Sequence, residues 1–182
     1  HALMVRSMAA ERAEPLLRRE VCEDFDYHAV RALRRQIMEA YIDENGVEAK
    51  AGLLPMLREL KQMGLRIGLA TATPEARARK YLRMVGAEAA FDAVACAEMV
   101  AHGKPAPDVY LLASRKLNLP PRVLLGVEDS PSGVQSAHAA GMTVAMVPDQ
   151  DQPSAEIAAL CALVAPSLAG IAPFVKESLR RP

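Results

Sequence analysis

Apolar residues recur at helical spacing in the first quarter of the chain. Residues 8–20 and 27–43 both place apolar side chains three or four positions apart, which predicts two amphipathic helices. In the second stretch the apolar positions are Val30, Leu33, Ile37 and Tyr41. Asp26 is suited to cap the second helix, and Asn45-Gly46 is suited to end it. This part of the chain shows no strand pattern.

After residue 50, short apolar runs alternate with helical segments. The runs predicted to be buried strands are residues 65–71, 92–96, 123–127 and 143–147. The segments predicted to be helical are residues 55–63, 74–85, 107–116 and 132–140, together with the tail up to residue 179. Strands that alternate with helices indicate an α/β fold with a parallel, doubly wound sheet.

Composition narrows the class of protein. The chain has 22 basic and 22 acidic residues, so its net charge of zero argues against nucleic acid or an anionic membrane as a partner. Aromatic residues are 4% of the chain, and no apolar run approaches the roughly 20 residues that span a bilayer. Three widely spaced cysteines fit a reducing compartment. We expect a soluble, cytoplasmic protein; nothing here indicates its oligomeric state.

Two adjacent carboxylates follow the third apolar run. Glu128 and Asp129 come directly after residues 123–127, and Ser130-Pro131 then opens the next predicted helix. Ligands of open α/β sheets bind outside the carboxyl ends of the strands. Paired acids at such a place need a compensating cation, and Mg²⁺ prefers carboxylate oxygens. We therefore predict that Asp129 and Glu128 hold Mg²⁺; alternatively, both are solvated acids at a helix start.

Two further strand-end segments offer groups for a phosphate. Thr71 ends the first run, and the turn through Ala72 to Pro74 leaves backbone N–H groups that suit an anion. Alternatively, this turn only begins a helix. Lys104 lies in a stiff loop between glycine and proline, where its ammonium could neutralise a phosphate oxygen and a nearby carboxylate. Alternatively, it is a solvated lysine in a rigid loop.

Taken together, these segments resemble the haloacid dehalogenase-like hydrolases, most closely the β-phosphoglucomutase-like phosphatases and mutases. The second motif of that family is a strand ending in Thr or Ser, matched by Thr71, and the third is a lysine loop, matched by Lys104. The fourth is a Glu-Asp-Ser-x-x-Gly turn, matched by residues 128–133. The resemblance covers residues 50–148 and implies a Rossmann-like core with an N-terminal helical cap.

The first motif of the family is missing from this sequence. In the family it is an apolar strand ending in Asp-x-Asp-Gly, which supplies a nucleophilic aspartate and a general acid–base aspartate. Asp24-Phe25-Asp26 has the acids at this spacing, but no apolar strand precedes it and Tyr27 replaces the glycine. We therefore expect a partial cap over residues 1–49 and a core over residues 50–182 without its first, central strand. This predicts a gap between the strands that end at Thr71 and Val127.

The resemblance also implies an activity. Its members suggest a Mg²⁺-dependent phosphatase or phosphomutase that acts on a small phosphorylated metabolite, such as a sugar phosphate, through an aspartyl-phosphate. Lys104 and Thr71 would contact the phosphoryl oxygens, with Asp129 and Glu128 at the metal. Arg6 resembles a cap arginine that contacts substrate, although we favour its reading as a surface helix residue.

The missing motif leaves two readings of the chain itself. We expect a truncated and inactive form of such an enzyme. The alternative is a non-catalytic homologue that binds phosphate or metal ligands without turning them over. A haloacid dehalogenase proper fits the lysine loop and the Glu-Asp-Ser turn less well.

Overall fold

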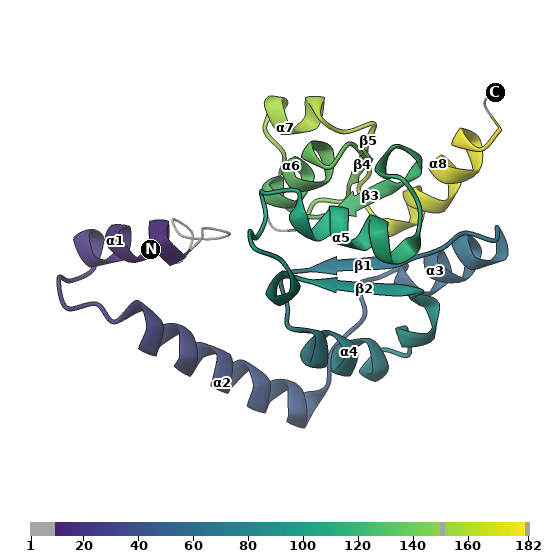
Figure 1. Cartoon of the computed structure of the whole chain (residues 1–182). Helices are drawn as coiled ribbons and strands as arrows, with labels where there is room; N and C mark the ends of the chain where they lie inside the picture. The colour runs from purple at the N-terminus through teal and green to yellow at the C-terminus, as the bar shows by residue number, and fades with distance from the viewer. Residues whose placement is uncertain (1–9, 150–151, 181–182) are drawn as a thin grey trace. The chain divides into compact units, whose positions relative to one another are not determined.

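The computed structural model describes residues 10–149 and 152–180, and the chain divides between Val47 and Glu48 into two units (Figure 1). In the first unit lie α1 (Ala10–Glu20) and α2 (Tyr27–Asn45). Asp26 caps α2, because its side chain accepts a hydrogen bond from the Ala29 N–H at 2.8 Å. Gly46 ends α2 with a φ of 78°, which a residue without Cβ adopts at no steric cost. The predicted cap at Asp26 and the predicted helix end at Gly46 are both confirmed.

The apolar side of α2 is exposed. An amphipathic period usually marks a face packed on a core, yet none of the residues of α2 is buried. Leu33, Ile37 and Tyr41 have exposed fractions of 57%, 61% and 64%. In α1, by contrast, Ala13 and Leu17 are buried. The helical period was therefore read correctly, although α2 buries no apolar stripe.

The strands of the second unit form two separate parallel groups. In one, β1 (Gly68–Thr71) pairs with β2 (Ala93–Cys96). In the other, the order is β3 (Leu125–Glu128), β4 (Thr143–Met146) and β5 (Leu163–Val164). Every pairing is parallel, as the alternation of strands and helices predicted.

Helices cover both faces of these strands. The α-helices are α3 (Leu53–Gln62), α4 (Glu75–Met84), α5 (Asp108–Leu117), α6 (Pro131–Ala139), α7 (Ala155–Ala159) and α8 (Ile171–Ser178). Short 3₁₀ turns lie at Glu88–Ala90, Ala97–Met99, Pro121–Val123 and Leu168–Gly170. On β4, Val144 and Met146 pack with α5 and α6, whereas Ala145 packs with α3 and α8. Burial of both faces is typical of a doubly wound sheet.

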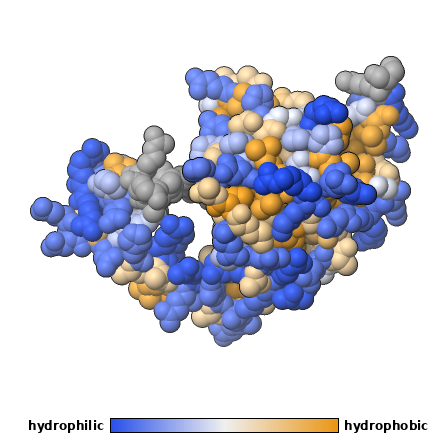
Figure 2. Space-filling view, viewed as in Figure 1, coloured by the Kyte–Doolittle hydropathy of each residue, from blue (hydrophilic) through white to orange (hydrophobic). Residues whose placement is uncertain are grey.

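Hydrophobic side chains also reach the surface of the second unit. Figure 2 shows apolar residues, in orange, around α5 and beside α8 on the face turned to the viewer. The helix α4, at the lower edge of the same face, is mainly hydrophilic. None of the described helices combines the length and apolarity needed to cross a bilayer.

A gap separates β1 from β3. Within the described residues, β1 is paired on one side only, with β2, and β3 on one side only, with β4. A cavity of about 560 Å³ lies between them, and both strands line it together with side chains of α3, α5 and α8. This confirms the gap predicted between the strands that end at Thr71 and Val127.

Three predicted elements differ from the structure. The strand predicted over residues 123–127 runs from Leu125 to Glu128, because Val123 belongs to a 3₁₀ turn. The strand predicted over residues 65–71 begins only at Gly68, because the Ile67 N–H donates to the side chain of Asp92 at 2.7 Å instead of joining the ladder. The tail predicted to be helical contains β5 between α7 and α8. Pairing with β4 favours an extended backbone there, and Pro166 cannot continue a helix.

We expect Gly126→Ala in β3 to lower the free energy of unfolding by about 1–3 kcal/mol, the usual cost of overpacking. A Cβ at this position would lie 2.8 Å from the Cβ of Ala137 in α6. Urea denaturation measures the change. Gly103→Ala is the control, because nothing lies within 4 Å of a Cβ added there. Equal stability of the two variants would show that α6 does not pack as closely against β3 as described.

Candidate functional site

Lys104 connects the two groups of strands at their carboxyl ends. Its loop leads into α5, and its Nζ donates to the Ala70 carbonyl of β1 at 3.2 Å. The same Nζ forms an ion pair with Oε1 of Glu128, the last residue of β3. Both side chains are largely buried, with exposed fractions of 17% and 6%. The lysine is therefore a fixed group of the site, unlike a solvated surface lysine.

Glu128 is held by several donors at once. Besides Lys104, its carboxylate accepts a hydrogen bond from the Tyr110 hydroxyl. The backbone N–H of Asp129 donates to Oε2 at 3.2 Å, and the Ser130 hydroxyl lies 3.4 Å from the same oxygen. A buried carboxylate is tolerated when it is paired and hydrogen-bonded in this way. Its orientation is thus set by residues from the lysine loop, α5 and the start of α6.

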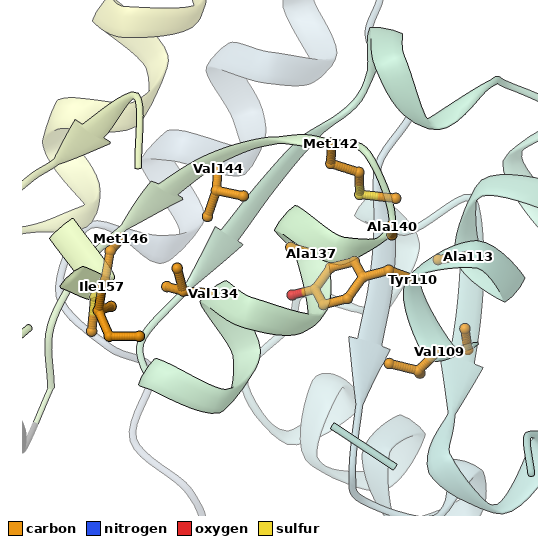
Figure 3. Close-up of a cluster of buried hydrophobic side chains, with 11 residues drawn as sticks. Val109, Tyr110, Ala113, Val134, Ala137, Ala140, Met142, Val144, Met146 and Ile157 are labelled. Carbon is orange, nitrogen blue, oxygen red and sulfur yellow. The ribbon is translucent and has the colours of Figure 1, made fainter. Parts of the chain in front are cut away.

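Tyr110 is a residue of the site that the sequence did not reveal. Burial and the adjacent Glu128 carboxylate raise its pKa well above the ordinary value, so the hydroxyl stays protonated and donates. Its ring centroid also lies 5.0 Å from the Lys104 Nζ, within the range of a cation–π contact. Figure 3 shows the ring among buried apolar side chains, with the hydroxyl oxygen on the side of Val134 and Ala137. The sequence predicted only that this residue lies in a helix.

Gly133 leaves room for the Glu128 carboxylate at the start of α6. A Cβ at residue 133 would overlap that carboxylate. The Ser130 hydroxyl accepts from the Gly133 N–H at 3.2 Å, so Ser130 caps α6 as predicted, and Pro131 takes the first helical position. The Glu-Asp-Ser-x-x-Gly pattern is therefore a local packing unit in which the glycine allows close approach.

Asp129 is the carboxylate of the pair that reaches the surface. Partial burial and the neighbouring charge of Glu128 raise its pKa above the ordinary value. A divalent cation would favour the ionised form, so this carboxylate suits a metal that keeps several waters. Glu128 is less suited to bind a metal, since its carboxylate oxygens already accept hydrogen bonds from Lys104, Tyr110 and Ser130. Within the described part of the chain, no three His, Cys, Asp or Glu side chains gather as a metal site.

Some backbone N–H groups of the turn after β1 already donate hydrogen bonds to nearby side chains. The Thr71 hydroxyl oxygen accepts from the Thr73 N–H at 3.1 Å. The first N–H of α4, on Glu75, donates to the carboxylate of Glu98 at 2.9 Å. The Thr71 hydroxyl keeps its proton for donation to a ligand, and the backbone of Ala72 lies in the same turn. The Lys104 Nζ binds the carbonyl of Ala70, the residue before Thr71 at the end of β1. Arg6 lies outside the described residues.

Comparison with known proteins supports the resemblance. The family model for haloacid dehalogenase-like hydrolases matches residues 4–141. Protein CbbY of Rhodobacter capsulatus is 41% identical over 108 residues, which cover 56% of this chain and 48% of CbbY. Hexitol phosphatase B of Escherichia coli K12 is 37% identical over 121 residues, or 63% of this chain and 54% of that protein. The chain thus spans about half the length of these curated relatives.

Solved structures support the fold. The crystal structure of β-phosphoglucomutase from Clostridium difficile matches with a TM-score of 0.74 at 22% sequence identity. The match covers 96% of this chain and 78% of that one. At this level of identity the likeness bears on the α/β architecture alone.

We expect Tyr110→Phe to lower the free energy of unfolding by about 1.5–3 kcal/mol, the usual worth of a hydrogen bond to a charged group. The substitution removes a donor from the buried carboxylate of Glu128. Tyr81→Phe is the matched control, because the buried Tyr81 hydroxyl has no hydrogen-bond partner. Urea denaturation of both variants measures the difference, and equal losses would contradict the role given to the Tyr110 hydroxyl.

We expect Asp129→Asn to stabilise the metal-free protein at neutral pH. Because folding raises the pKa of Asp129, the ionised form costs stability above that pKa, and asparagine carries no such charge. The advantage should shrink as the pH falls through the folded pKa and vanish below the ordinary carboxyl pKa of about 3.9. Thermal unfolding in EDTA at several pH values tests this, with the exposed Asp24→Asn as control. A gain that does not change with pH would contradict the expectation.

Proposed function

Because the chain belongs to the haloacid dehalogenase-like hydrolases, we propose that it serves the hydrolysis of a small phosphorylated metabolite, such as a sugar phosphate. The observation that carries this proposal is the position of Lys104 between Ala70 and Glu128 at the carboxyl ends of β1 and β3. Ligands of parallel sheets bind at this edge. The likeness to hexitol phosphatase B supports a phosphate ester as the substrate.

Lys104 is the proposed phosphate-binding cation. An ammonium has three N–H donors, and the Ala70 carbonyl and the Glu128 carboxylate take up two of them. The third remains for a phosphoryl oxygen, to which the Thr71 hydroxyl and the Ala72 backbone would add neutral donors. Fixed donors of this kind stabilise the charge of a transferring phosphoryl group without reorganisation. Glu128 would act indirectly, by orienting Lys104.

Asp129 is the proposed Mg²⁺ ligand. It is exposed beside the buried Glu128; partial burial and the charge of Glu128 raise its pKa, and a bound cation would favour the ionised carboxylate. One or two carboxylates, waters and substrate phosphate are the usual partners of Mg²⁺. The bound ion would supply neutralisation of phosphoryl charge. We propose that Glu128 completes the site by its hydrogen bonds and does not bind the ion directly.

Attack on phosphorus needs a group that the described site does not contain. The sequence has no Asp-x-Asp-Gly segment, which the family uses for the nucleophile and the acid–base group. We propose that an aspartate from outside this sequence completes the reaction through an aspartyl-phosphate. The same observation favours a second candidate function, in which the chain binds phosphate and metal ligands without hydrolysis.

The first unit is the proposed substrate-selecting cap. In the family a helical domain at this place in the sequence covers the leaving group, and closure of such domains sequesters the substrate from water. Its helices α1 and α2 carry many arginines, including Arg31, Arg34 and Arg35, which suit an anionic substrate.

We expect the 182-residue chain to bind inorganic phosphate in the presence of Mg²⁺ without hydrolysing sugar phosphates. Phosphate should raise the unfolding temperature, because a ligand that binds only the folded state stabilises it. The double variant Lys104→Met with Glu128→Gln should weaken phosphate binding at least tenfold, while it leaves no buried charge unpaired. The control is the double variant Lys176→Met with Glu156→Gln, at two exposed positions, because it makes the same substitutions and also leaves the net charge unchanged.

Two results would contradict parts of this proposal. Metal-dependent release of phosphate by the purified chain would show that it holds its own nucleophile. The absence of any stabilisation by phosphate would remove Lys104 and Thr71 from a phosphate site. Binding without turnover agrees with both candidate functions, and turnover after addition of an Asp-x-Asp-Gly strand would distinguish the enzyme from the binding module.

A further inference from the structure

A buried serine of α6 contacts the loop that carries Lys104. The side chain of Ser136 is fully buried, and its hydroxyl donates to the Ala106 carbonyl at 2.6 Å. A serine within a helix often donates to a carbonyl four residues earlier in the same helix. Here the acceptor lies 30 residues earlier in the chain, so the hydrogen bond ties α6 to the lysine loop.

The lysine loop depends on its carbonyl groups for anchoring. Pro105 and Pro107 lack a backbone N–H. The Ala106 N–H donates within the loop, to the Gly103 carbonyl at 3.0 Å. The Pro107 carbonyl accepts from the first turn of α5, where the Tyr110 N–H lies at 3.0 Å. The bond to the Ala106 carbonyl therefore fixes the middle of the loop to a second helix, α6.

The same part of α6 is packed closely against β3. At Gly126, a Cβ would lie 2.8 Å from the Cβ of Ala137. At Gly133, a Cβ would overlap the Glu128 carboxylate. Residues three and four apart are neighbours on a helix surface, so Ser136 and Ala137 lie beside Gly133. Close packing thus fixes α6 on β3, and the serine hydroxyl fixes the lysine loop to the same stretch of helix.

We propose that Ser136 is a positioning residue for Lys104. It acts through the Ala106 carbonyl, by holding the loop where the Lys104 Nζ reaches both the Ala70 carbonyl and the Glu128 carboxylate. A group that binds a ligand must be held within about 0.5 Å of its productive position, and hydrogen bonds from the residues behind it provide this. The inference rests on the proposed function, in which Lys104 is the phosphate-binding cation.

A second buried serine separates positioning from general stability. Ser114 of α5 is also buried, and its hydroxyl donates to the Leu119 carbonyl at 2.5 Å. Leu119 follows the carboxyl end of α5, whereas the lysine loop precedes its amino end. Ser136→Ala and Ser114→Ala each remove one such hydrogen bond, so both should lower the unfolding temperature by a few degrees.

Phosphate binding in the presence of Mg²⁺ is the first measurement, made on the full 182-residue chain. We expect Ser136→Ala to weaken it about fivefold, the factor that corresponds to one ordinary hydrogen bond. Ser114→Ala should bind phosphate as the unchanged chain does. Unchanged affinity in Ser136→Ala, or equal losses in both variants, would overturn the inference and leave the proposed function standing.

The Lys104 ammonium gives a second measurement, which needs no phosphate. In a chain labelled with ¹⁵N-lysine, its NMR signal is identified by its absence from the double variant Lys104→Met with Glu128→Gln. The Nζ donates to Ala70 and Glu128, so its protons should exchange slowly with water. We expect this exchange to be about fivefold faster in Ser136→Ala, because the loosened loop opens more often. Ser114→Ala should leave the rate unchanged.

The two measurements distinguish failure of this inference from failure of the proposed function. If the unchanged chain binds no phosphate, while Lys104 exchange rises in Ser136→Ala alone, the proposed function fails and the positioning of Lys104 by Ser136 stands. If Lys104 exchange does not respond to Ser136→Ala, or responds equally to Ser114→Ala, the inference fails whatever the phosphate affinity.

Discussion

The ion pair between Lys104 and Glu128 is the contact on which the carboxyl edge of this fold depends. Through it, a loop that also hydrogen-bonds to the end of β1 is tied to the end of β3. Both side chains are largely buried, and removal of one partner from such a pair typically costs about 3–5 kcal/mol. The Tyr110 hydroxyl and the backbone at the start of α6 give the carboxylate the further donors that a buried charge requires.

The two groups of strands are also held by the helices that pack across them. One apolar cluster combines Ala95 of β2 and Val109 of α5 with Val134 of α6 and Val144 of β4, so it reaches from one group to the other. A second cluster places Leu57 of α3 and residues of α8 on the opposite face. Packing on both faces thus supports strands whose edges β1 and β3 are not joined by a ladder.

The geometry links the fold to the chemistry of the site. The groups that we assign to phosphate lie at the carboxyl ends of β1 and β3, and the gap lies between the same two strands. Parallel strands bring their carboxyl ends to one edge, so these groups share one edge of the fold.

The sequence by itself determined the local features: the caps at Asp26 and Ser130, the alternation of strands and helices, and the lack of an apolar run to fill the centre of the sheet. These depend on neighbours within a few residues or on the periodicity of burial. Only the tertiary structure showed that Tyr110 donates to Glu128, and that Glu128 is occupied by Lys104. Periodicity predicts which side chains are buried, but the partner of a buried polar group comes from another element and depends on how the chain packs.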